Sequence, residues 1–139
     1  MKPRFEWLDH TGDVGIRVYG RDLREIFVYA TKALREALVS GEGRRQKKPL
    51  VIDLCGDSSE ILLLHFLKEI LYFFETQKGL PLRLDIKKLE ENHIVADVWT
   101  DLFDPRYHVL KTEIKAVTYH QLSIQKVEQG YQAQVIFDV

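Results

Sequence analysis

The chain has 139 residues, of which 45% are hydrophobic and 29% are charged, and its formal net charge is -1. This length and composition predict a single domain, residues 1–139, that can bury a core without disulfides or a structural metal. The near-neutral charge disfavours a protein that coats nucleic acid, because that role usually requires a basic excess. The single cysteine, Cys55, excludes an intramolecular disulfide and a cysteine zinc cluster.

The start of the chain shows no secretory signal. Residues 1–10 contain Arg4, Glu6 and Asp9 and lack a sustained apolar block. The longest apolar stretch, residues 61–74, is interrupted by charged side chains and is too short to span a bilayer. We therefore expect a cytoplasmic protein with no membrane partner.

Residues 15–19 alternate between apolar and polar or small side chains, and this pattern predicts a strand. A sharp turn through residues 10–13 precedes it, and Gly12 allows the backbone to turn without a Cβ penalty. Asp13 then stands at the start of the strand. It is either an Asx-type turn residue that bonds its own backbone or a functional carboxylate.

Two helices are predicted over residues 22–39 and 57–78, because each combines a capping signal with apolar residues at helical spacing. Asp22 and Asp57 are the predicted N-caps, and a glycine follows each helix shortly after its end. The second helix is apolar around most of its circumference. We therefore expect it to be covered on more than one side, by a sheet and a partner helix or by another subunit.

A basic run, residues 44–48 (RRQKK), separates the first helix from a short predicted strand at residues 50–54. We interpret this run as a solvated loop, and a local nucleic-acid-binding patch is the alternative. Direct contact with nucleic acid therefore stays open. Cys55 follows the apolar strand and is interpreted as a small buried hydrophobe rather than a nucleophile.

Two hairpins complete the chain, over residues 82–101 and 112–139. The loop between them, residues 101–108, is typical either of a functional loop or of a turn set by its proline. The elements run β, α, β, α and then several strands. This order predicts an α+β domain with two helices packed on a largely antiparallel sheet, which is mixed if the βαβ start makes part of it parallel.

Pairing the arms of the last hairpin about its turn places Asp138 near Tyr119 and His120, with the carboxylate of Val139 beside it. Clustered carboxylates without thiols favour a hard divalent cation such as calcium, magnesium or manganese. The polar groups that could converge are Asp13, Asp104, His108, Lys115, His120, Asp138 and the Val139 carboxylate. These residues alone indicate a metal site in a small α+β protein and no assignable nucleophile–base pair.

Four segments, spread from one end of the chain to the other, resemble the archease family. They are residues 10–16 (HTGDVGI), 103–108 (FDPRYH), 113–120 (EIKAVTYH) and 135–139 (VIFDV). The resemblance implies a non-enzymatic activator that promotes guanylylation of an RtcB-type RNA ligase in tRNA splicing and RNA repair. It also implies a second role, as a chaperone that modulates a tRNA cytosine methyltransferase.

Carried over by motif, the resemblance implies a metal site that contains Asp13 and Asp138, with a main-chain or terminal oxygen of Val139 and with Lys115 close by. The other motif positions with functional side chains are His10, Asp104, His108 and His120. A rival interpretation of the same carboxylates is a metal-dependent phosphoesterase. A further one is a binding module without metal, in which Asp13 and Lys115 form a buried ion pair.

Overall fold

Each helix is preceded by a residue whose side chain accepts a hydrogen bond from a free backbone N–H of the first turn. The computed structural model describes residues 4–10 and 12–139, apart from the side chain of His10. Helix α1 (Leu23–Leu38) follows Asp22, whose carboxylate accepts a hydrogen bond from the Glu25 N–H at 2.9 Å, as predicted. Helix α2 (Ser59–Gln77) is capped by Ser58 rather than by the predicted Asp57, since the Ser58 hydroxyl accepts from Ile61 N–H at 3.2 Å.

The strands form two main sheets and one short ribbon. The strands are β1 (Phe5–His10), β2 (Asp13–Gly20), β3 (Val39–Ser40), β4 (Leu50–Cys55), β5 (Gly79–Glu90), β6 (His93–Leu102), β7 (Val109–Leu110), β8 (Ala116–Val127) and β9 (Gly130–Asp138). One sheet has the order β1-β2-β9-β8, the other has the order β4-β6-β5, and β3 pairs with β7.

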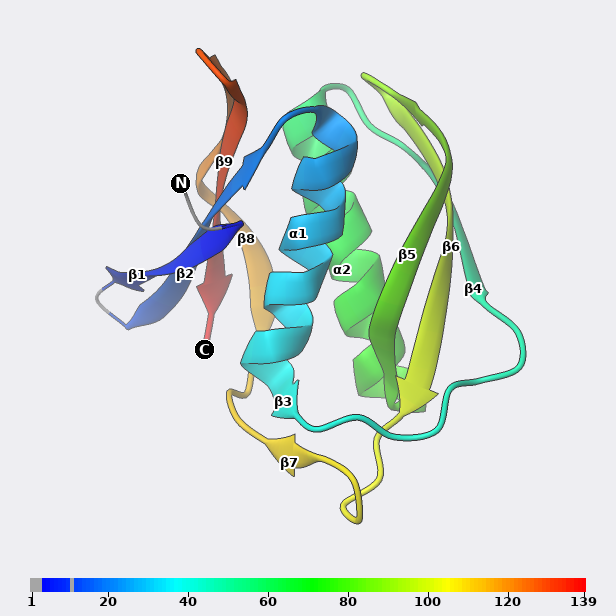
Figure 1. The fold of residues 1–139 in the computed structure, drawn as a ribbon. Helices are drawn as coiled ribbons and strands as arrows, with labels where there is room; N and C mark the ends of the chain where they lie inside the picture. Colours follow the sequence, from blue (N-terminus) through cyan, green and yellow to red (C-terminus); the bar gives the residue numbers. More distant parts are fainter. Residues whose placement is uncertain (1–3, 11) are drawn as a thin grey trace.

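The predicted fold class, α+β with two helices packed on antiparallel strands, is confirmed. Every strand pairing in the described residues is antiparallel, so the parallel part that a βαβ start would give does not form. The strands also divide into two sheets instead of one. Figure 1 shows both helices between the sheet that contains β2 and β9 and the sheet that contains β5 and β6.

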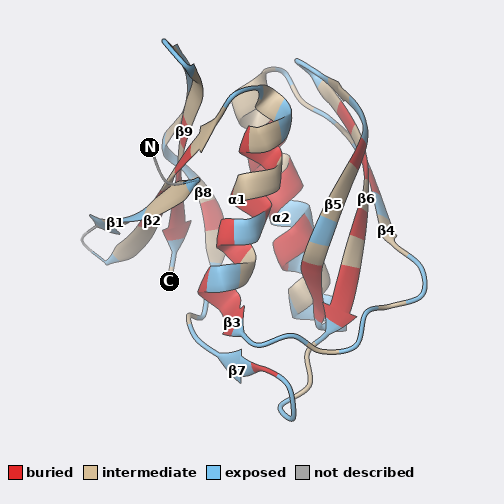
Figure 2. Ribbon diagram, in the orientation of Figure 1, coloured by how far each residue is buried: buried red, intermediate tan, exposed pale blue. Residues whose placement is uncertain are grey.

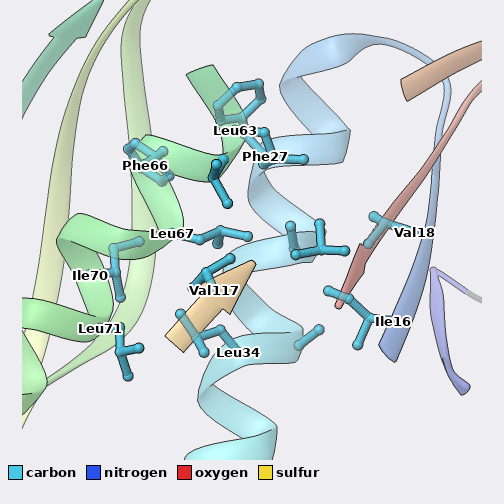
Figure 3. Close-up of a cluster of buried hydrophobic side chains, with 14 of the residues drawn as sticks. Ile16, Val18, Phe27, Leu34, Leu63, Phe66, Leu67, Ile70, Leu71 and Val117 are labelled. Atoms are coloured by element: carbon cyan, nitrogen blue, oxygen red, sulfur yellow. The ribbon is translucent and has the colours of Figure 1, made fainter. Parts of the chain in front are cut away.

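This layered arrangement explains why α2 is apolar on most sides. It contacts α1, strand β8 of one sheet, and strands β4 and β5 of the other. Figure 2 shows the buried faces of both helices turned toward these neighbours. In Figure 3, side chains from both helices meet Ile16 and Val18 of β2 and Val117 of β8. Phe27 and Phe66 pack edge to face across the two helices, with ring centroids 5.6 Å apart.

The last hairpin contains a bulge that moves its register. Thr118 lies opposite Ile136, yet the next pair along the hairpin is Ser123 with Gln134. Four residues of β8, 119–122, therefore face a single residue of β9, and Gln121 takes a left-handed backbone with φ of 52°. As a result Asp138 pairs with Ala116. The predicted placement of Asp138 beside Tyr119 and His120 is wrong for this reason.

Cys55 is exposed, so its interpretation as a buried hydrophobe is also wrong. It ends β4 directly opposite His93 of β6, on the face of the sheet that points away from the helices. Strand β4 carries its buried residue, Ile52, on the other face. None of the described helices is long and apolar enough to cross a membrane.

Candidate metal centre

The residues that meet at one end of the first sheet are the two predicted aspartates. The β2–β9 register sets Asp13 directly opposite Asp138, and we call these two residues the carboxylate pair. On either side, the backbone of His10 lies opposite Asp13 in β1, and Ala116 lies opposite Asp138 in β8. Residues paired in this way project from the same face of a sheet. Both carboxylates therefore project from the same face of the sheet, where one ligand can contact both.

The carboxylate pair lies on the face that points away from the helices. Its neighbours in the two strands, Val14 and Phe137, are directly opposite each other, and Phe137 belongs to the buried core between the sheets. Alternation along a strand then turns Asp13 and Asp138 outward. Asp13 is partly buried and Asp138 is exposed, so both are in contact with solvent while the backbone beneath them is fixed by the sheet.

Lys115 joins this end through its backbone. Its N–H donates to the main-chain oxygen of Asp138 at 2.7 Å, immediately before β8 begins. The side chain of Lys115 is exposed, and among the described residues it forms no ion pair with a carboxylate. A buried ion pair between Lys115 and Asp13 is therefore not part of this structure. Val139 follows Asp138, and its side chain packs against the core.

A cleft of about 500 Å³ opens beside Asp13. It lies between the β1–β2 hairpin, the C-terminal turn of α1 and the segment that precedes β8. The N–H groups of Lys111 and Thr112 donate to the carbonyls of Leu38 and Ala37, each at 2.9 Å, and hold that segment against the helix end. The charged residues that line the cleft are Asp9, Asp13, Glu36 and Lys111.

None of the histidines predicted from the sequence has a described side chain beside the carboxylate pair. His120 is exposed in the β8 bulge, where its N–H donates to the Thr118 hydroxyl at 3.2 Å. It is therefore separated from the carboxylate pair by several residues of β8. The backbone of His10 belongs to the carboxylate end, but its side chain lies outside the described residues. Among the described residues, no group of three His, Cys, Asp or Glu side chains is placed to hold a metal ion.

Asp104 and His108 belong to a separate cluster at the end of β6. The His108 ring is buried, and its Nδ1 accepts a hydrogen bond from the Asp104 N–H at 3.0 Å. Its Nε2 lies 2.7 Å from Asp101 Oδ2, and because an ionised carboxylate only accepts hydrogen bonds, Nε2 carries a proton and donates it. The Asp104 carboxylate turns to solvent and binds Arg106 at 2.7 Å. Hydrogen bonds from the Arg106 side chain and backbone hold the pKa of Asp104 at about 2.

Asp101, which sequence patterns do not single out, is the centre of this cluster. Its side chain is fully buried and accepts two hydrogen bonds from Arg35 of α1, at 2.6 and 3.0 Å. The Gly43 N–H donates to it at 2.6 Å, and His108 completes the set. Burial by itself raises the pKa of the Asp101 carboxyl, but the bonds from Arg35, Gly43 and His108 outweigh it and hold that pKa below its usual value. This buried network connects α1 to the loop that contains Gly43 and to the loop that contains His108.

The fold and the acidic end define a small α+β protein with two helices between antiparallel sheets and a carboxylate pair at the end of two central strands, β2 and β9. The Archease protein family (MTH1598/TM1083) model matches residues 5–139. The chain belongs to the archease family. It is 34% identical to the protein archease of Pyrococcus abyssi, with 98% of this chain and 99% of that protein covered. It is 33% identical to the protein archease of Methanosarcina acetivorans, with 98% and 96% covered.

Solved structures show the same fold. The solution structure of Methanobacterium thermoautotrophicum protein 1598 matches with a TM-score of 0.71 at 26% identity, and the match covers 98% of this chain and 99% of that one. The crystal structure of an archease from Thermotoga maritima, described as a possible chaperone, matches with a TM-score of 0.66. That match covers 100% of this chain and 97% of the other at 20% identity, so it bears on the fold alone.

Proposed function

We propose that this protein is a non-enzymatic activator of an RtcB-type RNA ligase, and that it promotes guanylylation of the ligase and so restores its turnover. Membership of the archease family supports the proposal. The observation that carries it is the carboxylate pair, because Asp13 and Asp138 come from two motifs that are far apart in sequence and meet in one register position. Lys115, from a third motif, is hydrogen-bonded through its backbone to Asp138.

We propose further that the carboxylate pair holds a divalent cation. Like charges directly opposite each other in a sheet are destabilising, and a cation between them removes that cost. Two carboxylates suit a hard cation such as magnesium, calcium or manganese, since magnesium commonly binds through one or two carboxylates and keeps several waters. A main-chain oxygen of Val139, which follows Asp138, is the further protein ligand that we propose. When bound, the cation would fix the positions of both side chains.

The ligase proposal predicts a gain in multiple-turnover RNA ligation. Adding this protein to a cognate RtcB-type ligase is expected to raise the number of joined RNA ends per ligase, while the protein alone joins none. The readout is the amount of ligated product under excess RNA. The same preparation, tested with manganese and generic phosphate esters, is expected to release no phosphate. Phosphate release that depends on the carboxylate pair would instead assign the site to an esterase.

A second candidate function is chaperone-like modulation of a tRNA cytosine methyltransferase. The observation that favours it is a set of exposed apolar side chains at the ribbon end of the molecule: Leu102, Tyr107, Val109 and Leu110. Exposed apolar patches commonly mark protein interaction sites. If this role holds, replacing both Val109 and Leu110 by serine is expected to reduce protection of the methyltransferase from heat-induced aggregation, measured by light scattering. Protection equal to that of the wild type would contradict it.

A further inference from the structure

Three side chains form a row across the outer face of the β4-β6-β5 sheet. Trp99 of β6 points away from the helices, because its neighbours Val98 and Thr100 are buried on the other side. Arg83 lies directly opposite Trp99 in β5. Arg45 approaches from the other side of β6, where its backbone bridges to Asp101. The guanidinium carbons of Arg45 and Arg83 lie 4.4 and 5.8 Å from the centre of the Trp99 ring. We call these three residues the Arg–Trp–Arg row.

The segment that carries Arg45 is held in place by the sheet. The Gln46 N–H donates to the carbonyl of Thr100 at 2.7 Å, and the Gly43 N–H donates to the buried Asp101 carboxylate. The interpretation of residues 44–48 as a solvated loop is therefore incomplete. The four basic side chains are exposed, but the backbone beside β6 is anchored at two points: the Gln46–Thr100 hydrogen bond, which belongs to the Arg45–Asp101 bridge, and the Gly43–Asp101 bond.

The cations of this surface have no acidic partner in the described part of the chain. Neither guanidinium of the Arg–Trp–Arg row hydrogen-bonds or ion-pairs with a carboxylate there, and the same holds for Arg44, Lys47 and Lys48. Asp85 and Asp97, two residues along from Arg83 and Trp99 on the same face, lie 3.1 and 4.0 Å from the ammonium of Lys87. A chain with a formal net charge of -1 therefore presents a local excess of positive charge here.

We propose that the Arg–Trp–Arg row binds the phosphodiester backbone of single-stranded RNA, and that Arg44, Lys47 and Lys48 bind neighbouring phosphates. A guanidinium matches the oxygens of a phosphate with two parallel hydrogen bonds. Stacking on Trp99 restricts both arginines before the ligand arrives, so less side-chain entropy is lost on binding. Surfaces that bind single strands combine a basic track with aromatic side chains in this way.

This inference goes beyond the proposed function, which requires only contact with a ligase. The geometry supports binding of a single strand with a phosphodiester backbone, and the choice of RNA over DNA rests on the proposed function. The site lies on the sheet that does not contain the carboxylate pair. Binding can therefore be measured without a ligase, and its failure would leave ligase activation untouched.

The test is fluorescence anisotropy of a labelled 12-nucleotide oligo(U) strand titrated with the full chain. The double variant Arg45→Ala/Arg83→Ala is expected to bind roughly tenfold or more weakly. Its plot of log affinity against log salt is expected to be shallower by about 1.4, the slope contributed by two phosphate contacts to a single strand. The matched control Arg21→Ala/Lys126→Ala removes two exposed charges elsewhere and is expected to stay within about twofold of the wild type.

A charge-neutral variant separates the stacked arrangement from simple charge. Trp99→Leu keeps every cation and is expected to weaken binding about threefold, because the guanidiniums lose the ring that positions them. A Trp7→Phe substitution leaves Trp99 as the remaining tryptophan. In that background, the fluorescence emission of Trp99 is expected to change when oligo(U) is added. The same addition to protein that also carries Arg45→Ala/Arg83→Ala is expected to leave the emission unchanged.

Three outcomes would overturn the proposal. The first is wild-type protein that does not bind oligo(U) at moderate salt. The second is Arg45→Ala/Arg83→Ala protein that binds as tightly as the wild type. The third is a 12-residue polyglutamate peptide that binds as tightly as oligo(U), which would assign the surface to acidic polypeptides. Equal binding of oligo(dT) and oligo(U) would support the phosphate site and remove the preference for RNA.

Discussion

Replacing Asp101 by asparagine is expected to lower the free energy of unfolding by about 3–5 kcal/mol, the usual cost of removing one partner of a buried ion pair. The Asp101 side chain is fully buried, and it accepts hydrogen bonds from Arg35, from the Gly43 N–H and from His108. Asparagine loses the negative charge and turns an NH₂ group toward this set of donors. Urea unfolding followed by circular dichroism measures the loss.

The matched control is Asp85→Asn, which removes the same charge from an exposed pair with Lys87 at 3.1 Å. Exposed ion pairs contribute about 0–1 kcal/mol, so this variant is expected to unfold close to the wild type. An Asp101→Asn protein as stable as the Asp85→Asn protein would show that the buried network does not hold the loops to α1.

The same network predicts how stability depends on pH. The pKa of Asp101 is lower in the folded chain than its unfolded value of about 3.9. Its contribution is therefore present above that unfolded value and is lost as the pH falls through the folded pKa. The stability difference between wild type and Asp101→Asn is expected to be constant near neutral pH and to shrink below about pH 4.

Loss of either carboxylate of the carboxylate pair is expected to abolish ligase activation while the fold remains. Asp13→Asn and Asp138→Asn each keep the shape of the side chain and remove the charge that a hard cation requires. Altering groups that merely support a metal ligand commonly costs 10–100-fold in affinity, so loss of a ligand is expected to cost roughly tenfold or more. Calorimetric titration with calcium, magnesium and manganese measures this directly.

Lys115→Ala is expected to abolish activation without a comparable loss of metal affinity or of stability. The reason is that the Lys115 backbone, which bonds Asp138, is unchanged, while its exposed ammonium is removed. The controls are Asp53→Asn and Lys126→Ala, which remove one exposed charge each at other places on the molecule. Unaltered activation by the Lys115→Ala protein would mean that the lysine has no part in the function.

The sequence predicted the elements that local pattern specifies. The α1 cap at Asp22 and the apolar circumference of α2 are both visible along the chain, and both were correctly interpreted. The motif at Asp13 and the motif at Asp138 were assigned to one place, and the strand register does set them opposite each other. Whether they bind metal stays a prediction.

What the sequence did not reveal depends on long-range pairing. The bulge places three more residues in β8 than in β9 and so shifts the register of the last hairpin. The left-handed position in this bulge is Gln121, so no glycine in the sequence marks it. Nothing local indicates that Arg35 and Asp101, 66 residues apart, form a buried pair. The division into two sheets likewise follows from which strands meet in space. A strand from Phe5 to His10 was missed because it has one paired side and no clean alternation.

The most direct test of the central claim is the rate at which a cognate RtcB-type ligase becomes guanylylated after a round of ligation. Labelled GTP, the ligase and either wild-type or Asp13→Asn protein are mixed, and the ligase-bound guanylate is measured over time. Wild-type protein is expected to accelerate guanylate formation, and the folded Asp13→Asn protein is expected to leave the basal rate unchanged. A wild-type rate equal to that of the ligase alone would contradict the account.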